Sequence, residues 1–251
     1  MTMKPNWNTN QSLALGSSRN NPGATHSRRS KWLGLVAAAV SLTAAPAMAA
    51  TWVGYMNVFN TAAGTKGGYV FGSGWGVADL KTTVSVLGSG MDQLILQPNY
   101  NTYADNAGDA FWRNNDGAGP DGNKWMEANT YVETASIAVS TFSFSGIVGS
   151  FTLNSNYVAE AFIKVLDPNS GYATVLNDRV ALPASGAFEI HSDLANYQGM
   201  ILQTGFTIEG LNANPDAEAS LGNVTVTVVP EPSAALLGVL GLAGILRRRR
   251  N

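Results

Sequence analysis

The sequence predicts an all-β protein, with one β-sandwich domain and an apolar segment near each end of the chain. Three observations predict this class. Short segments rich in Val, Ile, Thr and Phe recur over residues 50–229, and several alternate apolar with polar residues. Combinations of Gly, Pro, Asn and Asp that favour turns separate these segments. The only helical pattern in this region is short, at residues 192–200.

The expected strands follow one another at regular spacing from the start of the domain to its end. Their ranges are 53–59, 76–87, 93–97, 136–140, 141–147, 159–166, 173–180, 187–191, 200–209 and 223–228. Explicit turn sequences separate several of them, at residues 167–171, 212–215 and 221–223. Many short strands over about 180 residues favour a single β-sandwich of the jelly-roll type.

Composition excludes several kinds of site. The chain of 251 residues is 45% hydrophobic, which is enough for a substantial core. It has no Cys, so a disulfide framework, a thiolate nucleophile and a thiolate metal site are all excluded. Residues 51–229 hold 16 acidic and six basic side chains, which leaves this domain at about −10. Such a charge repels phosphate backbones, so we expect no nucleic-acid partner.

The N-terminal end has the pattern of an export signal. Basic residues precede an apolar run at residues 32–45, and Pro-Ala-Met-Ala follows at 46–49. A positive segment, an apolar segment and an A-x-A triplet define a signal peptide. We expect residues 1–49 to be this signal, with an extended basic start, and signal peptidase to cut between Ala49 and Ala50.

The C-terminal end combines a proline-flanked acid, an apolar run and an arginine cluster. Pro230, Glu231 and Pro232 come first, and the apolar run occupies residues 234–246. The run is short for a spanning helix, which needs about 20 residues, but long basic side chains extend its effective length. Positive charge stays on the cytoplasmic side of a membrane. Four residues form the cluster: Arg247, Arg248, Arg249 and Arg250.

These last 22 residues or so, 230–251, resemble the PEP-CTERM sorting signal. The resemblance implies a Gram-negative bacterium, recognition by an exosortase (a membrane cysteine protease) and removal of the tail. It also implies a precursor anchored in the inner membrane by its C-terminal helix, and a product at the cell surface or outside the cell. Proteins with this tail usually accompany exopolysaccharide and biofilm formation. An ordinary tail anchor, left in place, is the alternative.

The domain at residues 50–229 carries a weaker resemblance. Segments 161–167, 205–212 and 222–226 are similar to domains that accompany this tail, and those are similar to carbohydrate-binding or galactose-binding-like jelly rolls. The similar residues are mostly core strands and turns, so the resemblance bears on fold more than on function.

Residues 99–126 are polar, Gly-rich and aromatic at once, which predicts an ordered long loop. Two ligand sites are candidates there. Tyr100, Tyr103, Trp112 and Trp125 could stack on sugar rings, or they could fill the core or cover an edge of a sheet. Three other residues could supply oxygen ligands to Ca²⁺, or they could simply form turns: Asp116, Asp121 and Asn123. We expect no required cofactor, with Ca²⁺ as the candidate ion.

Catalysis has little support in the sequence. His191 is the one His of the domain, and no Gly-x-Ser-x-Gly elbow accompanies it. Residues 182–186, Leu-Pro-Ala-Ser-Gly, look like a sortase site but lie mid-domain, so we expect a loop between strands. The favoured hypothesis is a non-enzymatic surface or matrix protein that binds extracellular polysaccharide. A purely structural or adhesive component is the alternative, and a hydrolase with a carboxylate pair is less favoured.

Overall fold

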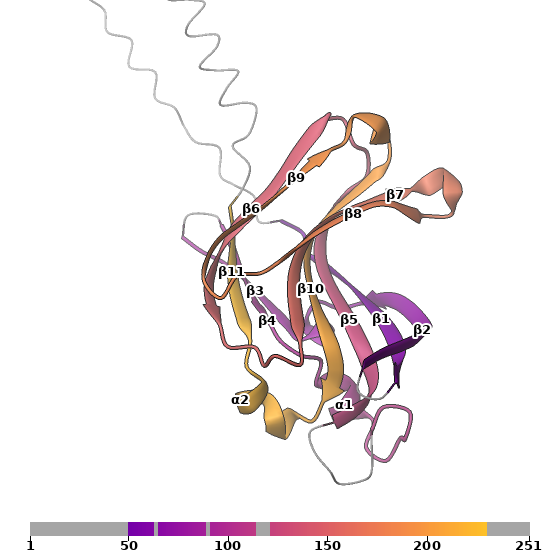
Figure 1. The fold of residues 1–251 in the computed structure, drawn as a ribbon, viewed down its shortest axis with the longest axis vertical. Coiled ribbons are helices and arrows are strands. Elements are labelled where there is room, and N and C mark those ends of the chain that lie inside the picture. The colour runs from indigo at the N-terminus through magenta and orange to yellow at the C-terminus, as the bar shows by residue number, and fades with distance from the viewer. Residues whose placement is uncertain (1–49, 63–64, 89–90, 114–120, 230–251) are drawn as a thin grey trace, which may run out of the picture. The chain divides into compact units, whose positions relative to one another are not determined.

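The computed structural model describes residues 50–62, 65–88, 91–113 and 121–229, which form two antiparallel β-sheets (Figure 1). The six-stranded sheet has the order β2 (Thr65–Trp75), β1 (Val53–Ala62), β5 (Asp121–Thr134), β10 (Ile201–Ala213), β7 (Val158–Asp167) and β8 (Ala173–Ala181). The five-stranded sheet has the order β3 (Thr82–Val86), β4 (Asp92–Leu96), β11 (Val224–Val229), β6 (Thr141–Phe151) and β9 (Gly186–Asp193).

Helical structure in the described residues is confined to short turns between strands. There are two short α-helices, α1 (Asn101–Asp105) and α2 (Glu218–Leu221). The 3-10 turns are η1 (Ala78–Leu80), η2 (Pro168–Ser170), η3 (Ala195–Tyr197) and η4 (Pro215–Ala217). The expected all-β sandwich is therefore confirmed. From β4 to β11 the chain passes from one sheet to the other at every connection except that from β7 to β8.

The core lies between the two sheets and is built by alternate residues of their strands. Phe144 of β6, Phe188 of β9 and Phe206 of β10 meet at its centre, with ring centroids 5.4 to 5.7 Å apart. A second, smaller cluster lies under β1 and β5, where Met56 and Met126 pack with Leu80 of η1. Because side chains alternate along a strand, each inward residue leaves its neighbours on the outer face of the sheet.

Some sequence expectations were wrong at the level of single elements. Residues 76–87 do not form one strand: the chain turns through η1, where the Asp79 carboxylate accepts a hydrogen bond from the Gly76 amide at 3.2 Å. Residues 136–140 are not a strand either, because the Ile137 amide and carbonyl bond to the backbone of residues 199–200 instead of a ladder. The helical pattern at 192–200 yields only η3.

Two long strands were not expected. β2 contains four glycines, which made its sequence resemble a loop, but pairing with β1 overrides that weak propensity. β5 begins inside the expected loop at 99–126. The expected loop at residues 182–186 is confirmed, since it joins β8 to β9. Within the described residues, no helix has the length and apolar character needed to cross a bilayer. The expected signal peptide and sorting tail lie outside those residues.

Candidate functional site

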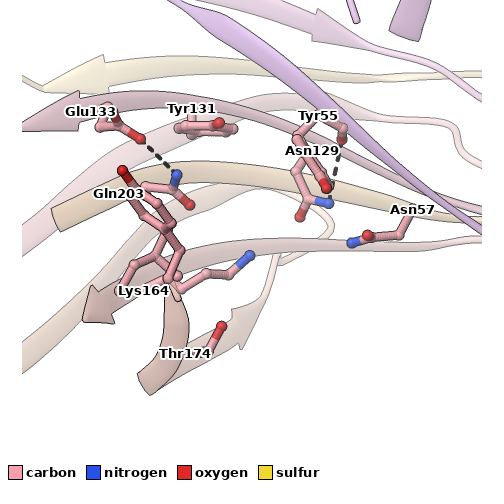
Figure 2. A pocket seen from close by; sticks show the side chains of 10 residues that line it. Tyr55, Asn57, Asn129, Tyr131, Glu133, Lys164, Thr174 and Gln203 are labelled. Atoms are coloured by element: carbon pink, nitrogen blue, oxygen red, sulfur yellow. Dashed lines mark hydrogen bonds between the residues drawn. The ribbon is translucent and has the colours of Figure 1, made fainter. Parts of the chain in front are cut away.

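The outer face of the six-stranded sheet contains a hollow of about 390 Å³. The hollow spans β1, β5, β10, β7 and the turn into β8, so residues far apart in sequence meet there (Figure 2). Its lining combines three tyrosines with amide, hydroxyl, carboxylate and amine groups. The lining residues are Tyr55, Asn57, Asn129, Tyr131, Glu133, Lys164, Leu166, Tyr172, Thr174 and Gln203.

Strand alternation puts these residues on the outer face. On β5, Met126 and Ala128 face the core, so Asn129, Tyr131 and Glu133 project outward. The same alternation on β10 turns Phe206 inward and Gln203 outward. The alternation of side chains along the paired strands therefore places the lining residues of the hollow on the outer face.

A glycine makes room for the central ring. Gly205 of β10 lies in register between Tyr131 and Phe162 on the neighbouring strands. A Cβ at Gly205 would collide with the carbonyl oxygen of Thr130 and lie 2.7 Å from the Tyr131 Cβ. Glycine thus lets the Tyr131 and Phe162 rings approach across β10, to a centroid distance of 6.5 Å.

Hydrogen bonds hold the polar groups of the hollow in place. The Gln203 amide donates to Glu133 Oε2 at 2.8 Å, as Figure 2 shows. The Asn129 amide nitrogen donates to the Glu127 carbonyl at 3.1 Å, and its oxygen accepts from the Thr207 hydroxyl at 2.8 Å. These three side chains, Glu133, Gln203 and Asn129, are oriented before any ligand arrives, which lowers the entropic cost of binding.

A network of charges adjoins the hollow, with Glu127 at its centre. Lys66 approaches Glu127 Oε2 at 2.8 Å, and Arg179 approaches Oε1 at 3.3 Å. Lys66 also contacts Glu209 at 2.9 Å, and Arg179 contacts Glu160 at 3.1 Å. Burial by itself would raise the pKa of Glu127, but the hydrogen bond and charge of Lys66, with the charges of Arg179 and Lys164, hold the pKa below its ordinary value.

Lys164 contributes a cationic group to the hollow itself. Its Nζ lies 4.9 Å from the centroid of the Phe162 ring. Burial lowers the pKa of Lys164, the charge of Glu127 opposes that shift, and the charge of Arg179 adds to it. The amine is therefore a hydrogen-bond donor whose charge is easier to remove than that of an exposed lysine.

The structure does not assemble the expected sugar-stacking platform from its four aromatic residues. Tyr100 is fully buried in the core and offers no open ring face. Tyr103 is covered by Arg113, whose guanidinium carbon lies 4.2 Å from the ring centroid. Trp112 packs on the smaller core cluster and contacts Phe71 edge-on. The core alternative describes Tyr100 and Trp112 better.

Trp125 differs from the other three predicted aromatics. It lies on β5, four residues from Asn129, so it shares the outer face with the hollow without lining it. Its indole nitrogen donates to Glu209 at 3.0 Å. Trp125 therefore belongs to the charged network beside the hollow.

The candidate calcium ligands are only partly described. Asp116 lies outside the described residues, and Asp121 is the first residue of β5. The Asn123 amide donates to the Ala110 carbonyl at 2.6 Å, so that side chain already braces a turn. In the part of the chain that the structure describes, no group of three or more His, Asp and Glu side chains could hold a metal ion. The calcium hypothesis stays a prediction.

A serine, a histidine and a glutamate meet on the opposite sheet. His191 Nδ1 lies 2.7 Å from the Ser143 hydroxyl, and Nε2 lies 3.2 Å from Glu189 Oε1. Ser143 of β6 and His191 of β9 are cross-strand partners, and Glu189 lies two residues before His191 on β9. The surface is open, with 68% of the His191 and 55% of the Glu189 side chain exposed. An acyl-transfer site also needs backbone donors aimed at an oxyanion in a water-excluding pocket, and an exposed ladder surface does not provide that environment.

The residues of the hollow were missed at the level of sequence, although a signal for them exists. On β5, the residues at 125, 127, 129, 131 and 133 are Trp, Glu, Asn, Tyr and Glu. Every second residue of a strand points to the same face, so these five residues would place aromatic rings and hydrogen-bonding groups together on one face of a sheet. The expected strands do not include residues 127–134, and residues 121–126 belong to the expected loop, so no expected strand carries that period.

Comparisons with known proteins assign no family. No family model matches the chain, and no curated protein matches it. A solved structure described as "CBM4 structure and function" aligns with 60% of this chain and 77% of its own, at 11% identity and a TM-score of 0.28. A likeness this remote assigns neither a fold nor a function.

Proposed function

We propose that the domain is a jelly-roll module that binds a segment of polysaccharide in the hollow of its six-stranded sheet. The order of β4 to β11, with β4, β11, β6 and β9 in one sheet and β5, β10, β7 and β8 in the other, supports the jelly-roll assignment. The hollow supports the ligand class. Tyrosine faces suit the apolar faces of sugar rings, and oriented amides, hydroxyls and a carboxylate suit their hydroxyl groups.

One observation carries the proposal: Tyr131 lies at the centre of this lining, with pre-oriented polar groups on both sides. Glu133 and Gln203 form one hydrogen-bonded pair, and Asn129 is held by two further hydrogen bonds. A ligand with many hydroxyl groups exchanges its bonds to water for bonds to groups already in place. An apolar ligand would displace water from these groups without replacing the hydrogen bonds that they make to it.

We propose binding without catalysis. Hydrolysis of a glycosidic bond ordinarily uses two carboxyl groups on either side of it. Among the described residues that line the hollow, Glu133 is the single carboxylate, and it accepts a hydrogen bond from Gln203. Glu127, nearby, is engaged by Lys66 and Arg179. Under this proposal Glu133 accepts hydrogen bonds from sugar hydroxyls, and no second carboxyl group of the described lining is placed to act with it on a glycosidic bond.

We further propose that the module acts outside the cytoplasm, at the cell surface or in an extracellular matrix. The export pattern at residues 1–49 and the resemblance of residues 230–251 to a PEP-CTERM tail support this location. Under this proposal signal peptidase and an exosortase process the ends, and extracellular polysaccharide is the partner. The purely structural alternative differs in one respect, because it requires no glycan to occupy the hollow.

The test is a glycan array probed with the exported, processed protein, with Ca²⁺ and with EDTA. We expect selective retention on a glycan and release of no reducing sugar. Replacing Tyr131 with Ala should weaken binding about tenfold or more, which is the loss of about 1.4 kcal/mol of ring contact. No binding from a folded protein would leave the structural alternative. If binding were lost only in EDTA, the binding site would instead involve the candidate calcium ligands.

Two exposed tyrosines provide a matched pair for this experiment. Tyr172 lines the hollow and is 62% exposed, while Tyr69 on β2 lies outside the hollow and is 61% exposed. Tyr172→Ala should weaken binding several-fold, and Tyr69→Ala should leave it unchanged. Equal effects would place the ligand elsewhere on the sheet.

A further inference from the structure

Asp92, the first residue of β4, carries a buried carboxylate that is only half satisfied. The residue is 6% exposed. Its Oδ2 accepts the Trp52 indole N–H at 2.8 Å and the Ala50 backbone N–H at 3.2 Å. Its Oδ1 is buried and accepts no hydrogen bond from the described residues. Asp92 therefore differs from Glu127, whose two oxygens both meet cations.

Such a carboxylate is costly unless a cation or further donors reach it. An indole and one amide together place two neutral donors on the same oxygen. No Lys or Arg of the described residues forms an ion pair with Asp92. Among the described residues, the Asp92 carboxylate therefore lacks a positively charged partner with several hydrogen-bond donors.

The expected export signal would generate that group at Ala50. Hydrolysis of the bond between Ala49 and Ala50 adds water across it: the C–N bond breaks, Ala49 leaves as a carboxylate, and the Ala50 nitrogen becomes an ammonium with three N–H donors. This nitrogen is the atom that already lies 3.2 Å from Oδ2. An ammonium there can donate to Oδ2 and to the unpartnered Oδ1 together, in a charge-assisted contact.

We propose that Asp92 is the receptor for the α-ammonium of Ala50, and that signal-peptide cleavage completes the fold. The contact would join the two sheets, because Ala50 leads into β1 of the six-stranded sheet and Asp92 opens β4 of the five-stranded sheet. Trp52 positions the receptor, since its indole bonds to Asp92 while its ring stacks on Phe206 at 6.1 Å. The uncleaved precursor would have a neutral amide in place of the ammonium.

The experiment exports the full chain, lets the cell process it, and begins with N-terminal sequencing. We expect Ala50 as the first residue. Four exported proteins are then compared by thermal unfolding: the natural chain and a chain with Gly-Ser inserted after Ala49, each with Asp92 or with Asp92→Asn. The insertion keeps the leader but moves the ammonium two residues away, and Asn keeps an acceptor for Trp52.

If the α-ammonium bonds to Asp92, the effect of Asp92→Asn on Tm depends on whether the Gly-Ser insertion is present. Asp92→Asn should lower Tm by about 5 °C in the natural chain and by clearly less in the chain with the insertion. Equal losses in both backgrounds, or a first residue other than Ala50, would overturn the proposal. If the Asn variants are not exported, the two Asp92 proteins still decide: the insertion should lower Tm, and an unchanged Tm overturns the contact.

Discussion

Glu127 shows how one side chain organises a whole sheet face. It is nearly buried, with 10% of its side chain exposed, yet it bonds to Lys66 of β2 and Arg179 of β8, from the two edge strands of the sheet. Its neighbours Asn57 and Asn129 also donate to it. The carboxylate thus links strands that share no ladder, and it holds the polar side chains next to the hollow.

The depressed pKa of Glu127 predicts an acid-dependent contribution to stability. A carboxyl whose folded pKa lies below its ordinary value of 4.5 stabilises the fold above that pH, and the contribution is lost as pH falls through the folded pKa. Glu127→Gln should lower the free energy of unfolding by about 2 kcal/mol at neutral pH, because it removes the carboxylate that Lys66 and Arg179 share and leaves each cation with one remaining acidic partner, Glu209 or Glu160. Below the folded pKa the difference between the two proteins should shrink.

Urea unfolding between neutral and acidic pH measures this difference. The control is Glu189→Gln, because more than half of the Glu189 side chain is exposed on β9. That substitution should change stability little at any pH. If Glu127→Gln lowered the free energy of unfolding by the same amount at every pH, the electrostatic explanation would be contradicted, and the loss would have to come from packing alone.

At the scale of elements, the junctions between strands depend on glycines for two different reasons. Gly171 closes the turn after η2 at φ 64° in open space. Gly222 joins α2 to β11 at φ 70° and ψ −161°, and a Cβ there would collide with the carbonyl oxygen of Thr152. The first position needs only a left-handed backbone, while the second also needs the absence of a side chain.

Alanine at these two positions separates the two requirements. Gly171→Ala should cost about 1 kcal/mol, which is the penalty of the left-handed conformation. Gly222→Ala should cost about 3 kcal/mol, because β11 must also move away from the Thr152 backbone. Chemical denaturation of the two variants measures the difference. Equal costs would mean that the chain around residue 152 relaxes freely.

At the scale of the whole molecule, charge should decide which polymers approach the sheet. Residues 51–229 carry 16 acidic and six basic side chains, so the domain is strongly acidic although the hollow contains Lys164. This field repels polyanions, whatever a single buried amine does locally. Neutral glycans experience no such repulsion.

Salt dependence tests this expectation. Affinity for a neutral glycan should stay nearly constant from about 50 mM to about 500 mM salt, because no ion pair forms on binding. A sulfated or uronate-rich polymer should bind weakly at low salt. Isothermal titration at both salt levels measures the affinity for each kind of polymer. If a polyanion bound and its affinity fell as salt rose, Lys164 would instead be an anion receptor.

The amino-acid sequence alone was sufficient to predict the class of fold and many of the strands. Alternation and turn residues are local properties, so β6 to β11 were all expected in nearly the right places. The turn at residues 167–171 was also readable, because Asp167 accepts from the Asn169 amide and the Ser170 hydroxyl within four residues. The patterns at the two termini are equally local, and they await the processing experiments.

Tertiary structure decided which side chains form a site. The sequence leaves Tyr100 open between a sugar-stacking position and a core position, and the fold buries it. Tyr131 is not among the residues that the sequence singles out, yet it lines the hollow, because burial depends on which strands pair. β2 and β5 became strands through pairing with β1 and β10, which local propensity does not reveal. The Ala50–Asp92 contact spans 42 residues and two sheets. Only the folded chain brings such distant groups within hydrogen-bond range.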